Sequence, residues 1–361
     1  MTGITLRPVL AAAACAASIA LSATVVAAPT AGAAPRPPVP PVGATADPAL
    51  ADFAKPGPLK VRTNYATGPC DRSLMGLIMG LQAHAEGNFE IAQCSDAFPY
   101  GLGSPVGVQI FAPVGAKAKG PYPPVIFVPG IAGNAGQYTT LARTWASHGF
   151  VVALPFTFWN SMIEVPTLGT AVLAHLNGRP GDPLYRKVDF SRVTYAGHSA
   201  GGQGALQAAS VYQDAGRAVI PNFRVVGVFT IQNGPLAVGS TVHVPALILG
   251  GRKDIVVPPW AWQKMWQYND LQSAPGYYAV AKSAHHLDVA RSAATNPFVG
   301  VTTAWLLYTA YRDRQAAEVF VGRDWALKHD KTFDEVLRNR AATRARLPQG
   351  TPTAPVRTRQ R

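Results

Sequence analysis

A serine flanked by small residues is the feature of this sequence best suited to chemistry. Ser199 lies in the run Gly197-His198-Ser199-Ala200-Gly201, after an apolar segment and before an Ala-rich one. This order predicts a strand, a sharp turn and a helix, which together hold a serine in a strained conformation with its hydroxyl exposed. The start of that helix also directs backbone N–H groups toward negative charge that develops beside the serine. We therefore expect Ser199 to be a nucleophile.

A carboxylate and two adjacent histidines follow the serine in an order suited to its activation. Asp254 ends the turn after an apolar run, and His285 and His286 follow another apolar run. A histidine can take the proton of the serine hydroxyl, and an aspartate can orient the ring and stabilise its protonated form. We expect Asp254 to be this acid and His285 the base, because His285 comes first after the strand. His286 is the alternative base. Asp288 is a weaker alternative acid, since it lies very close to the histidines in the chain.

A second loop of small residues offers hydrogen-bond donors. It reads Pro129-Gly130-Ile131-Ala132-Gly133-Asn134 and follows an apolar strand early in the chain. Acyl transfer needs two N–H groups aimed at the developing oxyanion, and the loss of one donor costs about 3 kcal/mol. We expect the backbone amides of Ile131 and Ala200 to be these donors. No metal or other cofactor is expected, because the histidines lack metal-site spacing and the cysteines are too few for a thiolate site.

Apolar segments alternate with helical ones through the centre of the chain. The expected strands are Val106–Ala112, Pro124–Pro129, Phe150–Phe156, Arg192–Ala196, Val225–Ile231, Ala246–Gly250 and Tyr277–Ala281. The expected helices are Tyr138–Ser147, Ala205–Tyr212, Pro259–Tyr268 and one within 162–182, whose loop would cover the site. This pattern is typical of an α/β fold, with a mostly parallel sheet and helices on both faces. Functional groups of such sheets lie at the carboxyl ends of the strands, so the groups above should meet there.

Together these motifs resemble the α/β-hydrolase superfamily, in particular its dienelactone hydrolase, chlorophyllase and bacterial cutinase-like (polyester hydrolase and lipase) group. The resemblance spans about Val106–Tyr311 and rests on PPVIFVPG, WASHGFVVALPF, AGHSAGG, VPALILGGRKD and SAHHLD. It implies an eight-stranded, mostly parallel sheet and ester hydrolysis through an acyl-enzyme. It also implies a Ser, Asp and His at the positions of Ser199, Asp254 and His285.

The sequence departs from the polyester-cleaving members of this group at two places. Those members tend to carry an aromatic residue beside the oxyanion glycine and a tryptophan after the strand that follows the nucleophile helix. Here Ile131 and the segment Asn233-Gly234-Pro235-Leu236 stand at these places. Stacking on an aromatic polymer is therefore not carried over from the resemblance.

The two ends of the chain differ in composition from its centre. Residues 1–34 have a basic start, an uncharged Ala/Val/Leu run and the sequence Ala31-Gly32-Ala33, as signal peptides do, which predicts export to the cell envelope or beyond. A membrane anchor is the alternative. Residues 35–58 are rich in proline and are expected to be an extended linker. The hydrolase domain, with an N-terminal extension, should then cover 59–342, and 343–361 should form a basic disordered tail.

Two cysteines remain once the predicted signal peptide is removed. Cys70 and Cys94 lie 24 residues apart in the N-terminal extension. In an oxidising compartment we expect them to form a disulfide, with two free buried thiols as the alternative.

Most of the net charge of +13 belongs to the C-terminal stretch from Arg338 to Arg361. Seven arginines and no acidic residue lie between Arg338 and Arg361. We expect this tail to contact an anionic cell surface or to aid solubility, and an amphipathic helix over Phe333–Arg340 to precede it. No nucleic-acid partner is expected, because the sequence lacks a basic face studded with aromatic residues.

Three functions fit these features. The first is an exported carboxylesterase or lipase that cleaves a small-molecule or lipid ester. The second is an acyltransferase acting on cell-envelope lipids or sugars, and the third is a non-catalytic binding protein on the same scaffold. The complete Ser, Asp and His set in hydrolase order favours the first. An apolar acyl or alkyl group is suggested by the aromatic residues that follow two of the strands, namely Phe156, Phe158, Trp159, Trp260, Trp262 and Trp266.

Overall fold

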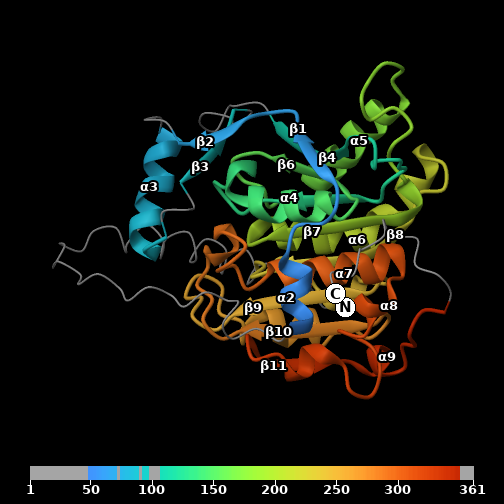
Figure 1. The fold of residues 1–361 in the computed structure, drawn as a ribbon. Helices are drawn as coiled ribbons and strands as arrows, with labels where there is room; N and C mark the ends of the chain where they lie inside the picture. The colour runs from blue at the N-terminus through green and yellow to red at the C-terminus, as the bar shows by residue number, and fades with distance from the viewer. Residues whose placement is uncertain (1–47, 71–73, 89–91, 97–105, 350–361) are drawn as a thin grey trace, which may run out of the picture.

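The computed structural model describes residues 48–70, 74–88, 92–96 and 106–349. Within them a nine-stranded sheet runs through the molecule in the order β1-β4-β6-β5-β7-β8-β9-β10-β11 (Figure 1). The strands are β1 (Lys60–Thr63), β4 (Gly107–Val114), β5 (Pro124–Val128), β6 (Val151–Phe156), β7 (Val193–His198), β8 (Val225–Ile231), β9 (Ala246–Gly251), β10 (Gly276–Ala281) and β11 (Phe333–Arg338). The six neighbours from β6 to β10 are parallel, whereas β1, β4 and β11 are antiparallel to the strands they pair with. The expected mostly parallel sheet is confirmed, with one strand more than the eight that the resemblance implies.

Helices cover both faces of this sheet because its strands are apolar on both sides. In β5, Phe127 belongs to the core on one face and its neighbour Ile126 to the core on the other. Trp145 packs over the first face, with its ring 5.5 Å from that of Phe127 and 5.4 Å from that of Phe229. Burying each of these rings contributes roughly 1.5–3 kcal/mol. The helices on the first face are α4 (Thr139–Ser147) and α7 (Val299–Tyr311), and those on the second are α5 (Glu164–Gly178) and α6 (Ala200–Val219).

The helix expected within 162–182 is present as α5 and packs against the sheet. Leu173 of α5 is fully buried in the core against the sheet. A Cβ on Gly169 would lie 2.8 Å from Pro155 and 2.9 Å from Ile126, so the helix backbone lies directly on the strands. Helix α5 therefore belongs to the layer that covers the sheet, and the covering loop stays a prediction.

The amphipathic helix predicted over Phe333–Arg340 is also wrong. Residues Phe333–Arg338 form β11, which pairs antiparallel with β10 and places Arg338 opposite Tyr277. An uncovered β10 would present a row of unpaired N–H and C=O groups, and pairing them outweighs the weak helix propensity of this segment. Arg338 also lies over the ring of Trp325, 4.9 Å from its centre.

Two segments placed outside the domain by the sequence pack onto it. Helix α2 (Pro48–Ala54) falls in the stretch expected to be a linker, and its Leu50 and Phe53 are buried against the core on the α7 side. At the other end, Ala345 and Leu347 pack against the same core although the tail was expected to begin at residue 343. The predicted signal peptide and the rest of the tail lie outside the described residues. Among the helices that are described, none combines the length and apolar character needed to cross a bilayer.

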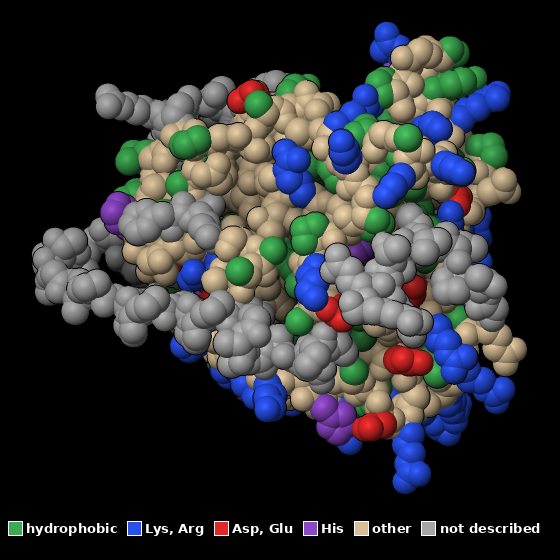
Figure 2. Space-filling model, in the orientation of Figure 1, with side chains coloured by type: hydrophobic (Ala, Val, Ile, Leu, Met, Phe, Trp, Pro, Cys, Tyr) green, Lys and Arg blue, Asp and Glu red, His purple; other side chains and the backbone are tan. Residues whose placement is uncertain are grey.

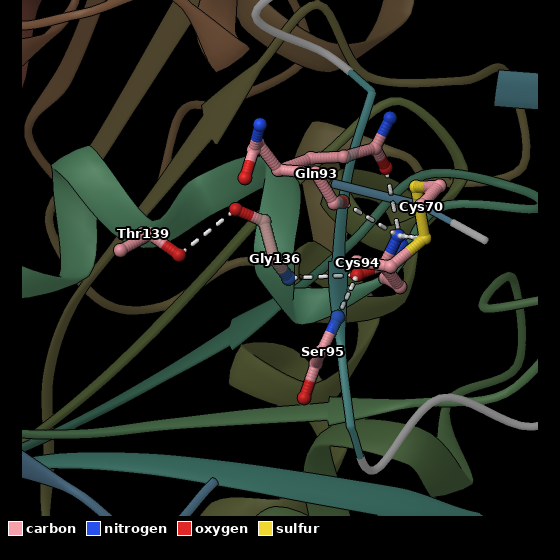
Figure 3. The surroundings of a disulfide bond; sticks show 8 residues. Cys70, Gln93, Cys94, Ser95, Gly136 and Thr139 are labelled. Atoms are coloured by element: carbon pink, nitrogen blue, oxygen red, sulfur yellow. Dashed lines mark hydrogen bonds between the residues drawn. A yellow bond between two sulfur atoms is a disulfide. The ribbon is translucent and has the colours of Figure 1, made fainter. Parts of the chain in front are cut away.

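The N-terminal extension is tied to the loop after β5. It contains β2 (Thr67–Pro69), α3 (Leu74–Glu86) and β3 (Gln93–Ser95), and the predicted Cys70–Cys94 disulfide is confirmed (Figure 3). The side chain of Asn134, just before the short helix η4 (Ala135–Tyr138), accepts from the N–H of Ser95 at 3.0 Å and donates to Gln93 O at 3.2 Å. A Cβ on Gly136 would lie 2.7 Å from the Cys94 carbonyl carbon, so this contact requires glycine. The extension is thus held beside the carboxyl end of β5.

Basic side chains dominate the charged surface. In Figure 2, Lys and Arg side chains are spread over much of the visible face and Asp and Glu are few, in keeping with the net charge of +13. Arg338, the first of the seven C-terminal arginines, is part of the fold and donates to Gly322 O at 2.8 Å.

Candidate active site

Ser199 occupies a tight turn between β7 and α6. Its backbone has φ 52° and ψ −126°, a region that residues other than glycine rarely enter. The turn is held by three backbone hydrogen bonds of 3.0 Å: the Ser199 N–H donates to Ile231 O, and Ser199 O accepts from Gly202 and Gly234. A Cβ on Gly201 would lie 2.2 Å from the carbonyl oxygens of the facing strand end, so the close crossing expected from the sequence is present.

His286 joins the serine to the acid. Its Nε2 lies 3.0 Å from Ser199 Oγ, and its Nδ1 lies 2.8 Å from Asp254 Oδ2. Because a carboxylate can only accept, Nδ1 carries the proton and Nε2 is free to accept from the serine hydroxyl. Such an arrangement can remove the proton from the hydroxyl as it attacks a carbonyl carbon.

The choice of His285 over His286 is therefore corrected. The chain makes a turn after β10, in which the His285 N–H donates to Asp288 Oδ2 at 3.0 Å and the His285 ring faces the same carboxylate at 3.4 Å. The ring of His286, one position later, reaches Ser199 and Asp254 instead. His285 was expected to be the base because it comes first after the strand, but this turn lies between the strand and the site, and the next residue reaches the serine. Asp288, the alternative acid, pairs with Arg291 at 2.6 Å instead of His286.

The carboxylate of Asp254 is buried and fully hydrogen-bonded. Its Oδ1 accepts from the N–H groups of Val256 and Val257, each at 2.9 Å. Its Oδ2 accepts from Gln232 Nε2 at 2.8 Å in addition to His286. Gln232 Nε2 also donates to His285 O at 2.9 Å, so this fully buried amide fastens the acid to the histidine loop. Gln232 was not predicted from the sequence, because its role follows only from the partners that the folded chain brings to it.

The environment of His286 favours its protonated form. Burial lowers the pKa of the imidazole, but the charge of Asp254, the hydrogen bond to it and the charge of Glu86 together outweigh burial, and the pKa is raised above 6.5. The carboxylate can therefore stabilise an imidazolium formed at Nε2. Burial in turn raises the pKa of Glu86 at the end of α3, an effect that the two histidines oppose.

The loop expected to hold the oxyanion lies against the serine. A Cβ on Gly130 would be 3.1 Å from the Cβ of Ser199. Asn160 fixes the loop by donating to Gly130 O at 2.7 Å and to Gly133 O at 3.0 Å. Within the described part of the chain, the N–H groups of Ile131 and Ala200 donate to no other protein group. Both donors named from the sequence are thus available beside Ser199.

Of the six aromatic residues named from the sequence, Phe156 is fully buried in the core, Phe158 packs against that core, and the four tryptophans divide into two sets. Trp262 and Trp266 are half-buried, and their indole N–H groups donate to Asn233 O at 2.8 Å and to Pro235 O at 3.2 Å, so they support the loop after β8. Trp159 and Trp260 are exposed, by 47% and 66%. Of these six aromatic residues, Trp159 and Trp260 therefore expose the most apolar surface.

One group of potential metal ligands occurs in the described ranges. Ligand atoms of Glu86, His285 and Asp288 lie within 4.8 Å of one another. Arg291 already pairs with Asp288 at 2.6 Å and supplies a positive charge there.

Comparison with known proteins places this site in a family. Residues 79–321 match the sequence model of the family described as PETase, PET hydrolase-like. The chain belongs to the PET hydrolase-like family. It is also 31% identical to Cutinase 1 of Thermobifida cellulosilytica over 193 residues, which are 51% of this chain and 67% of that protein. With a cutinase of Thermobifida fusca (strain YX) the identity is 31% over 193 residues, covering 58% of that protein. With Cutinase cut1 of Thermobifida fusca it is 28% over 250 residues, which are 67% of this chain and 72% of that protein. The resemblance to the bacterial cutinase-like α/β-hydrolases is confirmed.

Proposed function

We propose that this protein is a serine carboxylic ester hydrolase that works through an acyl-enzyme on Ser199. The observation that carries the proposal is the position of His286, which lies within hydrogen-bond distance of Ser199 on one side and Asp254 on the other. Membership of the PET hydrolase-like family and similarity to proteins named cutinases support ester cleavage as the reaction.

In the first half of the reaction, Ser199 Oγ attacks the ester carbonyl carbon while His286 Nε2 takes its proton. The resulting oxyanion is held by the N–H groups of Ile131 and Ala200, and Asp254 stabilises the imidazolium. The imidazolium then returns the proton to the alkoxy oxygen of the ester. The C–O bond breaks, the alcohol leaves and the acyl group stays on Ser199.

In the second half, water takes the place of the serine hydroxyl. His286 removes a proton from water as its oxygen attacks the acyl carbon, and the same two N–H groups hold the second oxyanion. The proton then passes to Ser199 Oγ, which leaves, and the carboxylic acid is released. Every step uses side chains and amides of this chain.

The surface beside the site favours an ester with an apolar acyl or alkyl group. Trp159 directly precedes Asn160, which holds the oxyanion loop. On the other side, Ile255 follows Asp254 and is 82% exposed, and Trp260 lies a few residues further on. Large exposed apolar side chains at a site mark a surface for apolar ligands.

Hydrolysis of p-nitrophenyl esters from acetyl to palmitoyl tests this proposal. We expect the wild-type chain to release p-nitrophenol, Ser199→Ala to lose turnover, and Ser210→Ala on α6 to retain it as a matched control. The chain-length optimum measures the room for the acyl group. Wild-type protein inactive on the whole series would contradict the proposal, and turnover that needs an added alcohol acceptor would support acyl transfer.

We also propose that the protein is exported and that its basic C-terminus contacts an anionic surface. The composition of residues 1–34 and the Cys70–Cys94 disulfide support export, since disulfides persist in oxidising compartments. N-terminal sequencing of protein from the medium or cell envelope should begin near Pro35. Retention of the uncleaved chain inside the cell would contradict export.

A further inference from the structure

A chain of three hydrogen bonds runs through the protein behind the serine. The Gly130 N–H donates to the Tyr138 hydroxyl oxygen at 3.1 Å. The Tyr138 hydroxyl lies 2.9 Å from His198 Nδ1, and His198 Nε2 lies 2.9 Å from His286 O. This series of hydrogen bonds therefore begins in the oxyanion loop and ends on the backbone of the histidine that faces Ser199.

The direction of each bond follows from which groups can donate. His286 O can only accept, so His198 Nε2 carries the proton and donates to it. His198 Nδ1 then has a free lone pair and accepts from the Tyr138 O–H. The Tyr138 oxygen in turn accepts from the Gly130 N–H, which is always a donor. All donors point the same way, and none of these groups is left unsatisfied along this path.

The surroundings keep His198 neutral. Tyr138 and His198 are 2% and 1% exposed. Burial is the main cause that lowers the pKa of His198 well below 6.5, and the nearby charge of His286, whose ring centre is 4.7 Å away, lowers it further. Burial raises the pKa of Tyr138, so its hydroxyl keeps its proton. The pattern of donors and acceptors therefore stays the same while His286 gains and loses a proton.

We propose that Tyr138 and His198 are positioning residues that fix the oxyanion loop and the His286 loop relative to each other on the two sides of Ser199. The inference rests on the proposed ester hydrolysis. The two loops follow β5 and β10, which are separated in the sheet by β7, β8 and β9, so the sheet itself does not join them directly. His198 ends β7, next to Ser199, and links one loop to the other. Gly130 directly precedes Ile131, whose N–H is the proposed oxyanion donor, so a shift of Gly130 moves that donor.

A double-mutant cycle on the full chain tests this inference. The variants are Tyr138→Phe, which keeps the ring and removes the hydroxyl, His198→Phe, and both together. The control is Tyr195→Phe on the same strand β7, whose hydroxyl lies 3.1 Å from Thr170 Oγ1 on the face of the sheet covered by α5. Each is assayed for kcat and KM on a short soluble p-nitrophenyl ester, and its unfolding is measured separately.

We expect Tyr138→Phe and His198→Phe each to lower kcat by roughly 10- to 100-fold, because displacement of the reacting groups by a fraction of an ångström to 1 Å has effects of this size. KM should change little. The kcat of the double variant should be no lower than that of the slower single variant, because both substitutions break the same series of hydrogen bonds. Tyr195→Phe should keep its kcat even where it unfolds more easily. Unchanged kcat in Tyr138→Phe, multiplied effects in the double variant, or an equal kcat loss in the control would overturn the inference.

A second measurement needs no turnover. In the ¹⁵N spectrum of histidine-labelled protein, the signals absent from His198→Phe belong to His198. They should report a neutral ring protonated at Nε2 between about pH 5 and 8. A ring that becomes charged in this range, or one protonated at Nδ1, would overturn the inference. A wild-type chain inactive on all esters would instead count against the proposed function, and the spectrum would still decide the roles of Tyr138 and His198.

Discussion

Replacement of Asp254 by asparagine should reverse the tautomer of the histidine that faces the serine. Asp254 Oδ1 accepts from the N–H groups of Val256 and Val257, so an asparagine must keep its carbonyl oxygen at that place. Turning the amide the other way would leave two N–H donors facing an NH₂ group. Each donor left without an acceptor would destabilise the fold by about 1–3 kcal/mol. The NH₂ group of Asp254→Asn therefore faces His286 Nδ1.

The consequence for the reaction is large because His286 has only two ring nitrogens. With a donor opposite it, Nδ1 must accept, and the proton moves to Nε2, which then points an N–H at Ser199 Oγ and cannot take its proton. In the wild type, Gln232 Nε2 donates to Asp254 Oδ2 at 2.8 Å. In the variant the new NH₂ group faces Gln232 Nε2, and this hydrogen bond is lost. We expect kcat to fall by about 10⁴, equivalent to about 5.5 kcal/mol in activation free energy.

The assay is hydrolysis of a p-nitrophenyl ester at saturating concentration, with Asp189→Asn as the matched control. Asp189 lies before the amino end of β7, away from Ser199, and pairs with Arg192 at 2.6 Å. Its replacement removes the same charge and should cost stability without lowering kcat more than about twofold, since this partly buried ion pair lies at the other end of β7 from Ser199. If Asp254→Asn lost less than tenfold in kcat, or no more than Asp189→Asn, the assignment of Asp254 would be refuted.

Further predictions concern pH, the extension and the turn. The raised pKa of His286 places the acid limb of kcat/KM above pH 6.5, because the base must be neutral in the free enzyme. Glu86→Gln removes a negative charge that raises this pKa, so it should move the acid limb to lower pH. An unmoved limb would exclude this influence of Glu86. Replacing Cys70 and Cys94 together by serine should lower the free energy of unfolding in urea by up to about 3.5 kcal/mol for a 24-residue separation. An unchanged midpoint would show that the disulfide does not stabilise the fold. Gly201→Ala places a Cβ 2.2 Å from two carbonyl oxygens and should abolish measurable esterase activity by distorting the turn, whereas near-normal activity would contradict the close crossing.

Features set by local sterics could be predicted from the sequence. The turn at Ser199 needs small residues next to a strand and a helix, and these requirements appear within one short segment. The parallel sheet could be predicted because strands buried on both faces are apolar throughout, as in β5 and β6. Ser199, Asp254 and the histidine pair each follow an apolar run, which placed them at the carboxyl ends of predicted strands.

Features set by contacts distant in sequence could not be predicted. The selection between His285 and His286 depends on the turn that Asp288 stabilises, and neither residue type nor spacing distinguishes them. The segment Phe333–Arg338 is a strand only because β10 offers it a partner edge. Helix α2 is short and becomes ordered where Leu50 and Phe53 find an apolar surface. Short segments of this kind depend on tertiary packing, which their own sequences do not show.

The polar groups behind the site belong to the same class. Gln232, Tyr138 and His198 are spread over about 95 residues of the chain, and each has a role only through partners brought by other strands. A glutamine after a strand and a tyrosine in a short helix are common, and their types alone carry no signal. Their burial and hydrogen bonds in the folded chain identify them.

Labelling with a serine-reactive phosphonate tests the central assignment most directly. The reagent attaches to an activated serine, and peptide mapping by mass spectrometry then locates the adduct. We predict one adduct on Ser199, formed at a similar rate in wild type and in His285→Ala and at least about 100-fold more slowly in His286→Ala, because the base contributes 10²–10⁴-fold. An adduct on another residue, no adduct, or slow labelling in His285→Ala and not in His286→Ala would contradict the account.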